Sequence, residues 1–425
     1  MSREGARFVF FVLLLSLLTA LVDPGASFAA RSRIAASSTV PIPSQLIVNV
    51  RETAGVARAG EVVRSGVPLA RSLDVKSVSG LAIVDASGQA VPAEFKVTAR
   101  WNGSKNDATL PIQWLLVGFP ATVDANSTAA YRLVTDGSVA NPAPARPVTV
   151  TRNGNAVTVD TGAAIFRLGA GSGALFDEVV LDNGTRLIGG SKLAMKSGGA
   201  EWAHSTTRKV TIEHQGPLSA VVVVQGTYDM PAVGGGQMST RRRYVFTAGS
   251  PTAVVRHVAN WEGNLCTACV TTSTGAVNGV LIERLRDELA VELGGTPTVT
   301  AVGNFGAPAV TGSVGATESA WVRQQLRGSR KAPLAFDVNV AGAATGGVKA
   351  DGGLLAASGP AGTVAISLNH MHRYEPQALR LLPGGNLAID AVDDKTWLSS
   401  RQGLFATLAV TAAPGTLSRA ELNRL

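Results

Sequence analysis

The stretch Val91-Pro-Ala-Glu-Phe-Lys-Val-Thr-Ala-Arg-Trp101 alternates apolar and polar side chains along its length. Because successive side chains of a strand point to opposite faces of a sheet, this pattern predicts a half-buried β-strand. Shorter runs of the same kind surround it, separated by Ser-Gly and Asn-Gly turns: 46–50, 81–84, 112–119 and 131–134. Residues 45–140 are therefore predicted to form a small all-β domain.

A proline-rich segment, Asn141-Pro-Ala-Pro-Ala-Arg-Pro147, follows this domain. Proline has no N–H for a sheet ladder and favours extended backbone, so the segment indicates a linker. Beyond it, strand-like runs recur roughly every 8–12 residues with glycine-containing turns, a spacing typical of a sandwich or barrel. Residues 148–415 are therefore predicted to form a large antiparallel β-sandwich, with a C-terminal tail at 416–425, and the fold class to be all-β.

One segment of the predicted sandwich fits two structures, because its leucines lie four residues apart: Leu281, Leu285, Leu289 and Leu293. The spacing matches a helical stripe, and it equally matches one face of a strand whose other face carries Arg286 and Glu288. We favour the strand because the segments around it are all predicted to be β.

The N-terminus has the features of an export signal. Arg3 and Arg7 precede fifteen apolar residues at 8–22, and small residues then offer a cleavage site after Ala29. Residues 1–29 are predicted to be a signal peptide and 30–44 a linker, which places the mature protein in a secreted or periplasmic location. An uncleaved anchor is the alternative. No other apolar run is as long, and spanning a membrane takes ~20 residues.

The composition excludes several classes of protein. Hydrophobic residues make up 45% of the chain and charged residues 16%, so it can bury a core and is not disordered as a whole. The net charge of +8 is dispersed and lacks a basic tail, so nucleic acid is not expected as a partner, whereas an acidic polysaccharide is compatible with it.

The two cysteines of the chain lie close together in Cys266-Thr-Ala-Cys269. In an oxidising compartment this spacing favours a structural disulfide, with a redox pair as the alternative. A metal site would need two further ligands, and no second CxxC motif is present. Neither a metal nor a cofactor is predicted.

The first domain also resembles a known family, on four segments: Gly66-Val-Pro-Leu-Ala70, Leu81-Ala-Ile-Val-Asp85, Val91-Pro-Ala-Glu-Phe95 and Ile112-Gln-Trp-Leu-Leu-Val-Gly-Phe119. They look like the N-terminal barrel of the exo-rhamnogalacturonan lyase and YetA-like family. Arg242-Arg-Tyr-Val-Phe246 and Arg373-Tyr-Glu-Pro376 are similar to segments of that family's central sandwich. The resemblance implies a RIFT-related β-barrel, a β-sandwich and then an α/α toroid.

The sequence reaches Leu425 without the toroid that the resemblance implies. A separately encoded toroid is therefore a possible partner, and no catalytic residue is carried over from the family.

The segment Asn369-His-Met-His-Arg-Tyr-Glu375 is the densest cluster that could serve a uronate lyase. Such an enzyme must neutralise the uronate carboxylate and hold a base near the adjacent C–H. On a strand, His370, His372 and Tyr374 would share one face and Arg373 the other. These four residues are the catalytic candidates. The alternative is a polar strand edge with Tyr374 packed before Pro376.

Two further clusters are candidates for carbohydrate binding. Arg241 and Arg243 would lie on one face of a strand and could hold a carboxylate, although a solvated sheet face explains them equally. Trp261 could stack on a sugar, since aromatic rings suit sugar C–H surfaces, or be a core residue. Its neighbours complete this second cluster: His257, Asn260 and Glu262.

Three functions follow from these features. The favoured one is a secreted module that binds acidic glycan, such as rhamnogalacturonan, without cleaving it. The second is a reduced polysaccharide lyase that acts by β-elimination on uronic-acid polymers. The third is a structural or envelope module that contacts other proteins. Binding is favoured over catalysis because an enzyme must lower a barrier by about 8 kcal/mol or more, which an exposed cluster seldom achieves.

Overall fold

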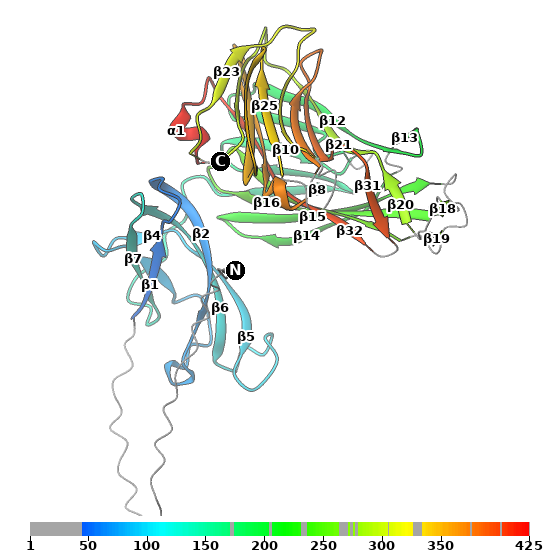
Figure 1. The fold of residues 1–425 in the computed structure, drawn as a ribbon. Coiled ribbons are helices and arrows are strands. Elements are labelled where there is room, and N and C mark those ends of the chain that lie inside the picture. Colours follow the sequence, from blue (N-terminus) through cyan, green and yellow to red (C-terminus); the bar gives the residue numbers. More distant parts are fainter. Residues whose placement is uncertain are drawn as a thin grey trace, which may run out of the picture. The chain divides into compact units, whose positions relative to one another are not determined.

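The structure of the protein is a computed structural model that describes residues 45–424 except for 171–173, 204–205, 231–235, 263–270, 273–274, 277–278, 305, 326–333, 375 and 400–401. The described residues belong to one compact unit, Pro43–Leu425. They form antiparallel strands joined by turns, with two 3₁₀ turns, Arg71–Leu73 and Met371–Arg373, and one short helix, α1 (Arg419–Leu422) (Figure 1). The predicted all-β class is confirmed.

The first seven strands form two small sheets. One holds four strands in the order β1 (Gln45–Arg51), β7 (Thr128–Val134), β3 (Ala82–Val84) and β4 (Ala90–Val91). The other holds β2 (Arg58–Pro68), β6 (Ile112–Val123) and β5 (Glu94–Arg100). Among the described residues these sheets do not join into a closed ring, so the closed barrel implied by the resemblance is not observed.

The two small sheets enclose a core of their own, in which the Phe119 and Tyr131 rings lie 4.8 Å apart. The strand predicted from 91–101 is present as β5. The division of the chain at residues 141–147 stays a prediction, since both sides of it belong to the same compact unit.

The rest of the chain builds a sandwich of two large sheets. The first has twelve strands, eleven of them in this order: β26 (Ala343–Gly347), β25 (Phe336–Val340), β24 (Ala320–Gln324), β29 (Gln377–Leu381), β30 (Leu387–Val392), β21 (Arg284–Val291), β12 (Arg186–Ser197), β11 (Glu178–Leu181), β10 (Ala164–Leu168), β9 (Ala156–Asp160) and β8 (Thr149–Asn153). The remaining strand, β13 (Ala200–Ala203), pairs with β12.

The second large sheet has nine strands, in this order: β14 (Thr206–Gln215), β15 (Ser219–Met230), β16 (Gly236–Thr247), β17 (Thr252–Trp261), β32 (Gly403–Ala413), β28 (Gly362–Asn369), β27 (Gly352–Gly359), β22 (Thr298–Val302) and β23 (Val310–Ser313). Two short ladders complete the fold, β18 (Thr271–Thr272) with β19 (Gly275–Ala276) and β20 (Gly279–Ile282) with β31 (Thr396–Ser399).

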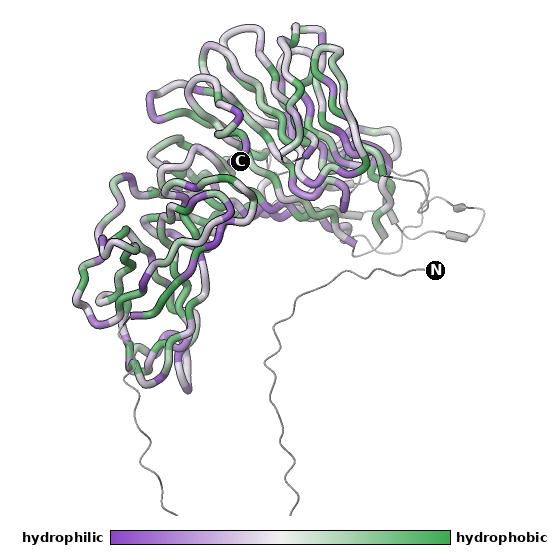
Figure 2. The backbone as a smooth tube through the Cα atoms, turned by 60° about the vertical axis from the view of Figure 1, so that its left-hand side comes forward, coloured by the Kyte–Doolittle hydropathy of each residue, from purple (hydrophilic) through white to green (hydrophobic). Residues whose placement is uncertain are grey.

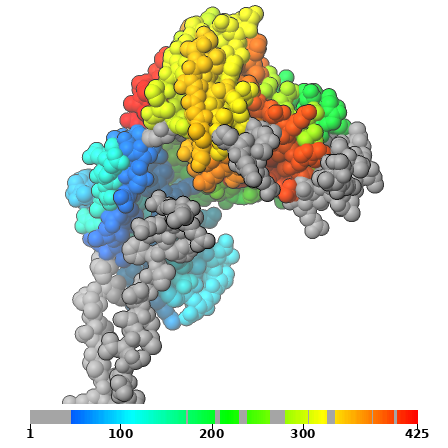
Figure 3. All heavy atoms as spheres, in the orientation of Figure 1, coloured from blue at the N-terminus to red at the C-terminus, as the bar shows by residue number. Residues whose placement is uncertain are grey.

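A single large core lies between these two sheets. Hydrophobic and hydrophilic stretches follow one another along the strands that enclose it (Figure 2), and Figure 3 shows one face of the molecule with its side chains in place. Its centre is an aromatic group with ring centroids 5.1–6.1 Å apart: Phe166, Phe176, Tyr244 and Phe246.

One ion pair crosses this core. Arg242 of β16 donates through Nη2 to Asp287 Oδ1 of β21 at 2.6 Å, and the two side chains are only 2% and 3% exposed. Burial raises the pKa of the Asp287 carboxyl, while the charge of Arg242 acts in the opposite direction. The pair therefore joins the two sheets at a point where a lone charge could not be accommodated.

The ambiguous leucine segment is confirmed as β-structure. Leu285 and Leu289 of β21 point into the core, and Arg286 and Glu288 alternate with them on the opposite face. The predicted signal peptide at 1–29, the linker at 30–44 and the Cys266–Cys269 disulfide lie outside the described residues. No described helix is long and apolar enough to cross a membrane.

Candidate ligand-binding face

The outer face of the nine-stranded sheet carries two neighbouring rows of side chains that alternate with core residues. Strand register places Arg243 opposite Arg256, and Arg256 opposite Thr407, in a polar row. The adjacent row crosses more strands and consists of small and apolar residues: Val254, Ala409, Ser367, Leu354 and Val302. The register of six strands therefore brings cations and hydroxyls beside a row of small and apolar residues.

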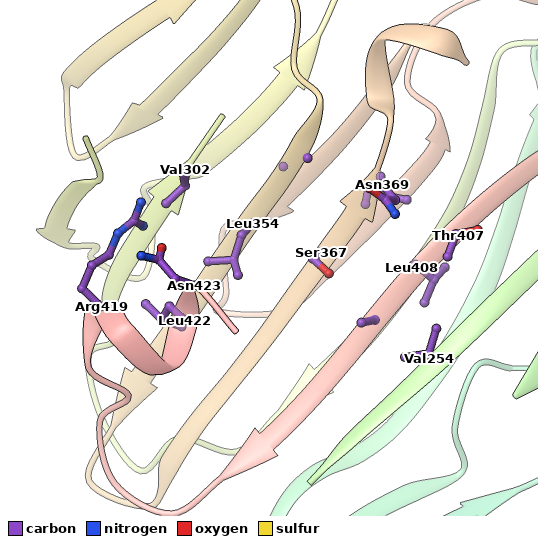
Figure 4. Close-up of a pocket in the computed structure, with 14 residues that line it drawn as sticks. Val254, Val302, Leu354, Ser367, Asn369, Thr407, Leu408, Arg419, Leu422 and Asn423 are labelled. Atoms are coloured by element: carbon purple, nitrogen blue, oxygen red, sulfur yellow. The ribbon is translucent and has the colours of Figure 1, made fainter. Parts of the chain in front are cut away.

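A pocket of about 350 Å³ lies on this face, and we call it the outer-face pocket (Figure 4). Its polar lining comes from Ser367 and Asn369 of β28 and Thr407 of β32, and its apolar lining includes Val254 and Leu354. Helix α1 contributes the remaining wall, with the residues Arg419, Leu422 and Asn423. The pocket therefore combines hydrogen-bonding groups with an apolar surface.

Helix α1 is held in this position by its cap and by packing. Ser418 and Glu421 form a reciprocal capping box at its N-terminus. Leu422, 5% exposed, packs with Val302 and Leu354 of the sheet. Arg419 donates through Nη2 to the carbonyl of Ala307 at 2.8 Å. These contacts make a helix of four residues a fixed wall of the outer-face pocket.

The prediction that residues 369–375 continue a strand is wrong. Strand β28 ends at Asn369, His370 adopts a left-handed conformation with φ of 55°, and Met371–Arg373 form a 3₁₀ turn. His370, His372 and Tyr374 therefore do not share a face through strand alternation. Met371 is instead buried in the main core, and Arg373 is exposed.

The turn nevertheless brings the two histidines together beside the outer-face pocket. The rings of His370 and His372 meet edge to face with centroids 6.2 Å apart. His372 Nδ1 lies 3.0 Å from Asp351 Oδ1, and Asp351 directly precedes Gly352, which lines the pocket. A histidine–aspartate pair thus stands next to the pocket. Among the described residues, no three His, Cys, Asp or Glu side chains gather as a metal site requires.

Tyr374 packs against a residue that sequence analysis missed. Its ring centroid is 5.8 Å from that of Phe405, and the two residues are 40% and 37% exposed. Phe405 lies on β32 two residues before Thr407, and therefore on the same outer face. In the sequence, Leu404, Ala406 and Leu408 alternate with Phe405, and this alternation indicates that Phe405 faces away from the core.

Arg241 and Arg243 lie on one face, as strand alternation predicts, but both bind a carboxylate of the protein itself. Arg241 Nη2 donates to Glu213 Oε1 at 2.8 Å, and Arg243 Nε donates to Glu213 Oε2 at 2.7 Å. Arg256, which precedes His257 of the second predicted cluster, is exposed on the neighbouring strand. It adds a positive charge next to the outer-face pocket.

The second predicted carbohydrate cluster is divided between two faces. His257 and Trp261 are 2% and 1% exposed and point into the core, so stacking of Trp261 on a sugar is excluded by its burial. Asn260 alternates with them on the outer face, and Glu262 is exposed just beyond the strand. The alternation of β17 explains the division, because odd and even positions face opposite sides.

Comparison with known proteins gives matches in structure alone: no family model and no curated protein matches the sequence. A glycosyl hydrolase family 38 protein from Enterococcus faecalis is similar at 10% identity and a TM-score of 0.48, over 88% of this chain and 45% of that chain. The protein described here thus spans less than half of that relative's length.

Two smaller proteins are also similar in structure. One is a galactose mutarotase-like protein from Lactobacillus casei, at 8% identity and a TM-score of 0.34, over 62% of this chain and 99% of that one. The other is a putative aldose 1-epimerase from Klebsiella pneumoniae, at 8% identity and a TM-score of 0.38, over 63% of this chain and 83% of that one.

Proposed function

We propose that the protein binds acidic carbohydrate at the outer face of the nine-stranded sheet. The observation that carries this proposal is that an exposed cation, Arg256, pairs with Thr407 of the pocket lining, and that Phe405, two residues from Thr407 on the same face, forms an exposed aromatic pair with Tyr374. Its volume of about 350 Å³ lies in the ~300–1,000 Å³ range of small-molecule sites.

Each part of the face matches one part of a uronic acid. The aromatic rings offer flat apolar surface to the C–H side of a sugar ring. The guanidinium of Arg256 can pair with the carboxylate through two parallel N–H groups. Ser367, Asn369 and Thr407 supply donors and acceptors for hydroxyls. The resemblance of the sequence to the rhamnogalacturonan lyase family makes pectin-derived uronates the first ligands to test, and the predicted signal peptide places the protein outside the cytoplasm.

The test is titration calorimetry of the purified chain with oligogalacturonides and rhamnogalacturonan fragments. Arg256→Ala should weaken binding by about tenfold or more, since a hydrogen bond to a charged group contributes about 1.5–3 kcal/mol. Arg152→Ala removes an exposed arginine from β8 of the other sheet and should leave affinity unchanged. Added salt should weaken binding to the wild type. Equal affinity in both variants would exclude this face.

A β-elimination activity is a second proposal, supported by His372 and Asp351. Their 3.0 Å contact offers a base held by a carboxylate next to the pocket, and Arg256 could neutralise the uronate carboxylate. Absorbance of the unsaturated uronate product separates the two functions. A flat trace with polymer bound supports binding alone, whereas product that disappears in His372→Gln supports the lyase.

A further inference from the structure

The outer face of the twelve-stranded sheet holds a second polar cluster, whose pocket shares no lining residue with the outer-face pocket. Asp390 of β30 is fully buried and accepts from Arg286 of β21, through Nε at 2.6 Å and Nη2 at 2.8 Å. Arg380 of β29 donates to the same carboxylate through Nε at 3.1 Å. Three adjacent strands are thus joined through one buried carboxylate, which fixes the position of the Arg380 guanidinium.

A second network lies on the neighbouring strands β24 and β25. Asp337 accepts from Arg323 Nε at 3.1 Å and from Gln325 Nε2 at 2.8 Å, and the indole N–H of Trp321 also donates to it. Although burial raises the pKa of Asp337, the hydrogen bonds from Gln325 and Trp321 and the charge of Arg323 outweigh it, so the pKa lies below its ordinary value. Asp337 therefore stays ionised and orients Arg323.

A pocket of about 320 Å³ is lined by members of both networks, and we call it the arginine–aspartate pocket: Arg323, Gln325, Pro376, Arg380, Asp393 and Asp394. Arg380 also donates through Nη2 to Asp393 Oδ1 at 2.5 Å. Arg323 lines this pocket and is held through Nε by Asp337.

We propose that the arginine–aspartate pocket binds a neutral sugar residue. Its two guanidiniums and two carboxylates cancel in charge, which favours an uncharged ligand over a uronate. A sugar hydroxyl both donates and accepts, so it can bridge a guanidinium and a carboxylate that lie side by side. The site is separate from the outer-face pocket, because the two lie on opposite sheets of the sandwich. The protein would then hold an acidic and a neutral sugar at two places.

Trp321 supplies a local reporter for this site. Its indole N–H bonds to the carboxylate that also holds Arg323 and Gln325, so a ligand on those side chains changes the environment of the indole. Labelling the six tryptophans with 5-fluorotryptophan gives a small set of ¹⁹F signals, and Trp321→Phe assigns the relevant one. The probes are the methyl glycosides of galactose, glucose, mannose and rhamnose.

At least one of these glycosides should shift the Trp321 signal saturably, and the methyl glycoside of galacturonic acid should need at least a tenfold higher concentration to shift the same signal. Asp394→Ala and Arg323→Ala should each weaken binding of the neutral glycoside at least tenfold, as measured by calorimetry. Arg256→Ala should not affect it. Absence of any shift of the Trp321 signal, a shift of that signal by the acidic glycoside at lower concentration than by the neutral ones, or full affinity for the neutral glycoside in both pocket variants would overturn the proposal. The outer-face pocket is tested separately by uronate binding, which should be lost in Arg256→Ala and kept in Arg323→Ala.

Discussion

Tyr374 and Phe405 lie with ring centroids 5.8 Å apart, and each keeps more than a third of its surface exposed. Tyr374 follows a 3₁₀ turn, and Phe405 lies on the strand β32. Exposed aromatic side chains that contact each other offer a flat apolar surface at low entropic cost, since two χ angles fix each ring.

Removal of this surface should weaken ligand binding without loss of stability. Phe405→Ala should lower affinity for a bound uronate oligosaccharide by about two- to tenfold, which corresponds to about 0.5–1.5 kcal/mol. Calorimetry measures the affinity, and thermal unfolding checks the fold. Trp397→Ala is the matched control, because Trp397 is 42% exposed but lies on β31, which pairs with β20 and does not belong to the nine-stranded sheet. Equal losses in both variants would contradict a specific role of Phe405.

Gly353 should be required for the turn that follows β28. A Cβ at this position would lie 2.4 Å from Met371 Sδ and 3.2 Å from Val322 Cγ1. Gly353→Ala should therefore destabilise the protein by about 1–3 kcal/mol, as measured by urea unfolding. Addition of Met371→Ala makes room for the new methyl group, so the double variant should be more stable than the sum of the two single losses. Strict additivity would show that Gly353 and Met371 do not interact.

The buried pair of Arg242 and Asp287 should matter more when it is broken than when it is replaced. Asp287→Asn leaves the Arg242 charge in the core and should cost about 3–5 kcal/mol of unfolding free energy. The double variant Arg242→Met with Asp287→Leu should recover most of that loss. Denaturant unfolding of the three proteins measures both effects. A loss below about 1 kcal/mol in Asp287→Asn would contradict the assigned burial of the pair.

His214 should make the stability of the protein depend on pH. Burial lowers the pKa of His214, while Glu94, 3.4 Å away, acts against that shift and Arg64 and Lys96 act with it. The folded pKa thus lies below the ordinary value of 6.5, so the unfolded chain takes up the proton first as the pH falls. Stability from this group is therefore present above pH 6.5 and decreases as the pH falls from there towards the folded pKa.

Replacement of His214 tests this sign. Urea unfolding at several pH values, from about pH 8 to about pH 5, should show a smaller pH-dependent loss for His214→Gln than for the wild type. If the free energy of unfolding changed equally with pH in both proteins, His214 would not contribute to the pH dependence of stability.

Side-chain alternation predicted much of the fold, because burial on one face of a strand leaves a period of two in the sequence. Arg286 and Glu288 alternate with Leu285 and Leu289 on a strand, as predicted, although the leucine spacing also fitted a helix and the β character of the surrounding segments decided the prediction. The same rule placed Arg241 and Arg243 together. It could not reveal Glu213 as their common partner, because that contact depends on how β14 and β15 pair with β16.

The candidate site was harder to predict than the fold. Strand β28 ends at Asn369 because His370 adopts a left-handed conformation, and although histidine is enriched in that region, only a small minority of histidines adopt it, so the residue type alone does not predict the turn. Trp261 could be a core residue or a ligand platform until the register of β17 was known. Asp393 and Asp394 line the arginine–aspartate pocket only because β29, β30 and β24 are neighbours in the sheet.

The central claim, that acidic carbohydrate binds at the outer face of the nine-stranded sheet, is tested most directly by a crystal structure with trigalacturonate bound. The account predicts electron density for a sugar ring against Phe405 and Tyr374, with its carboxylate paired to Arg256. Density for the ligand at another surface of the protein, with this face unchanged, would contradict it.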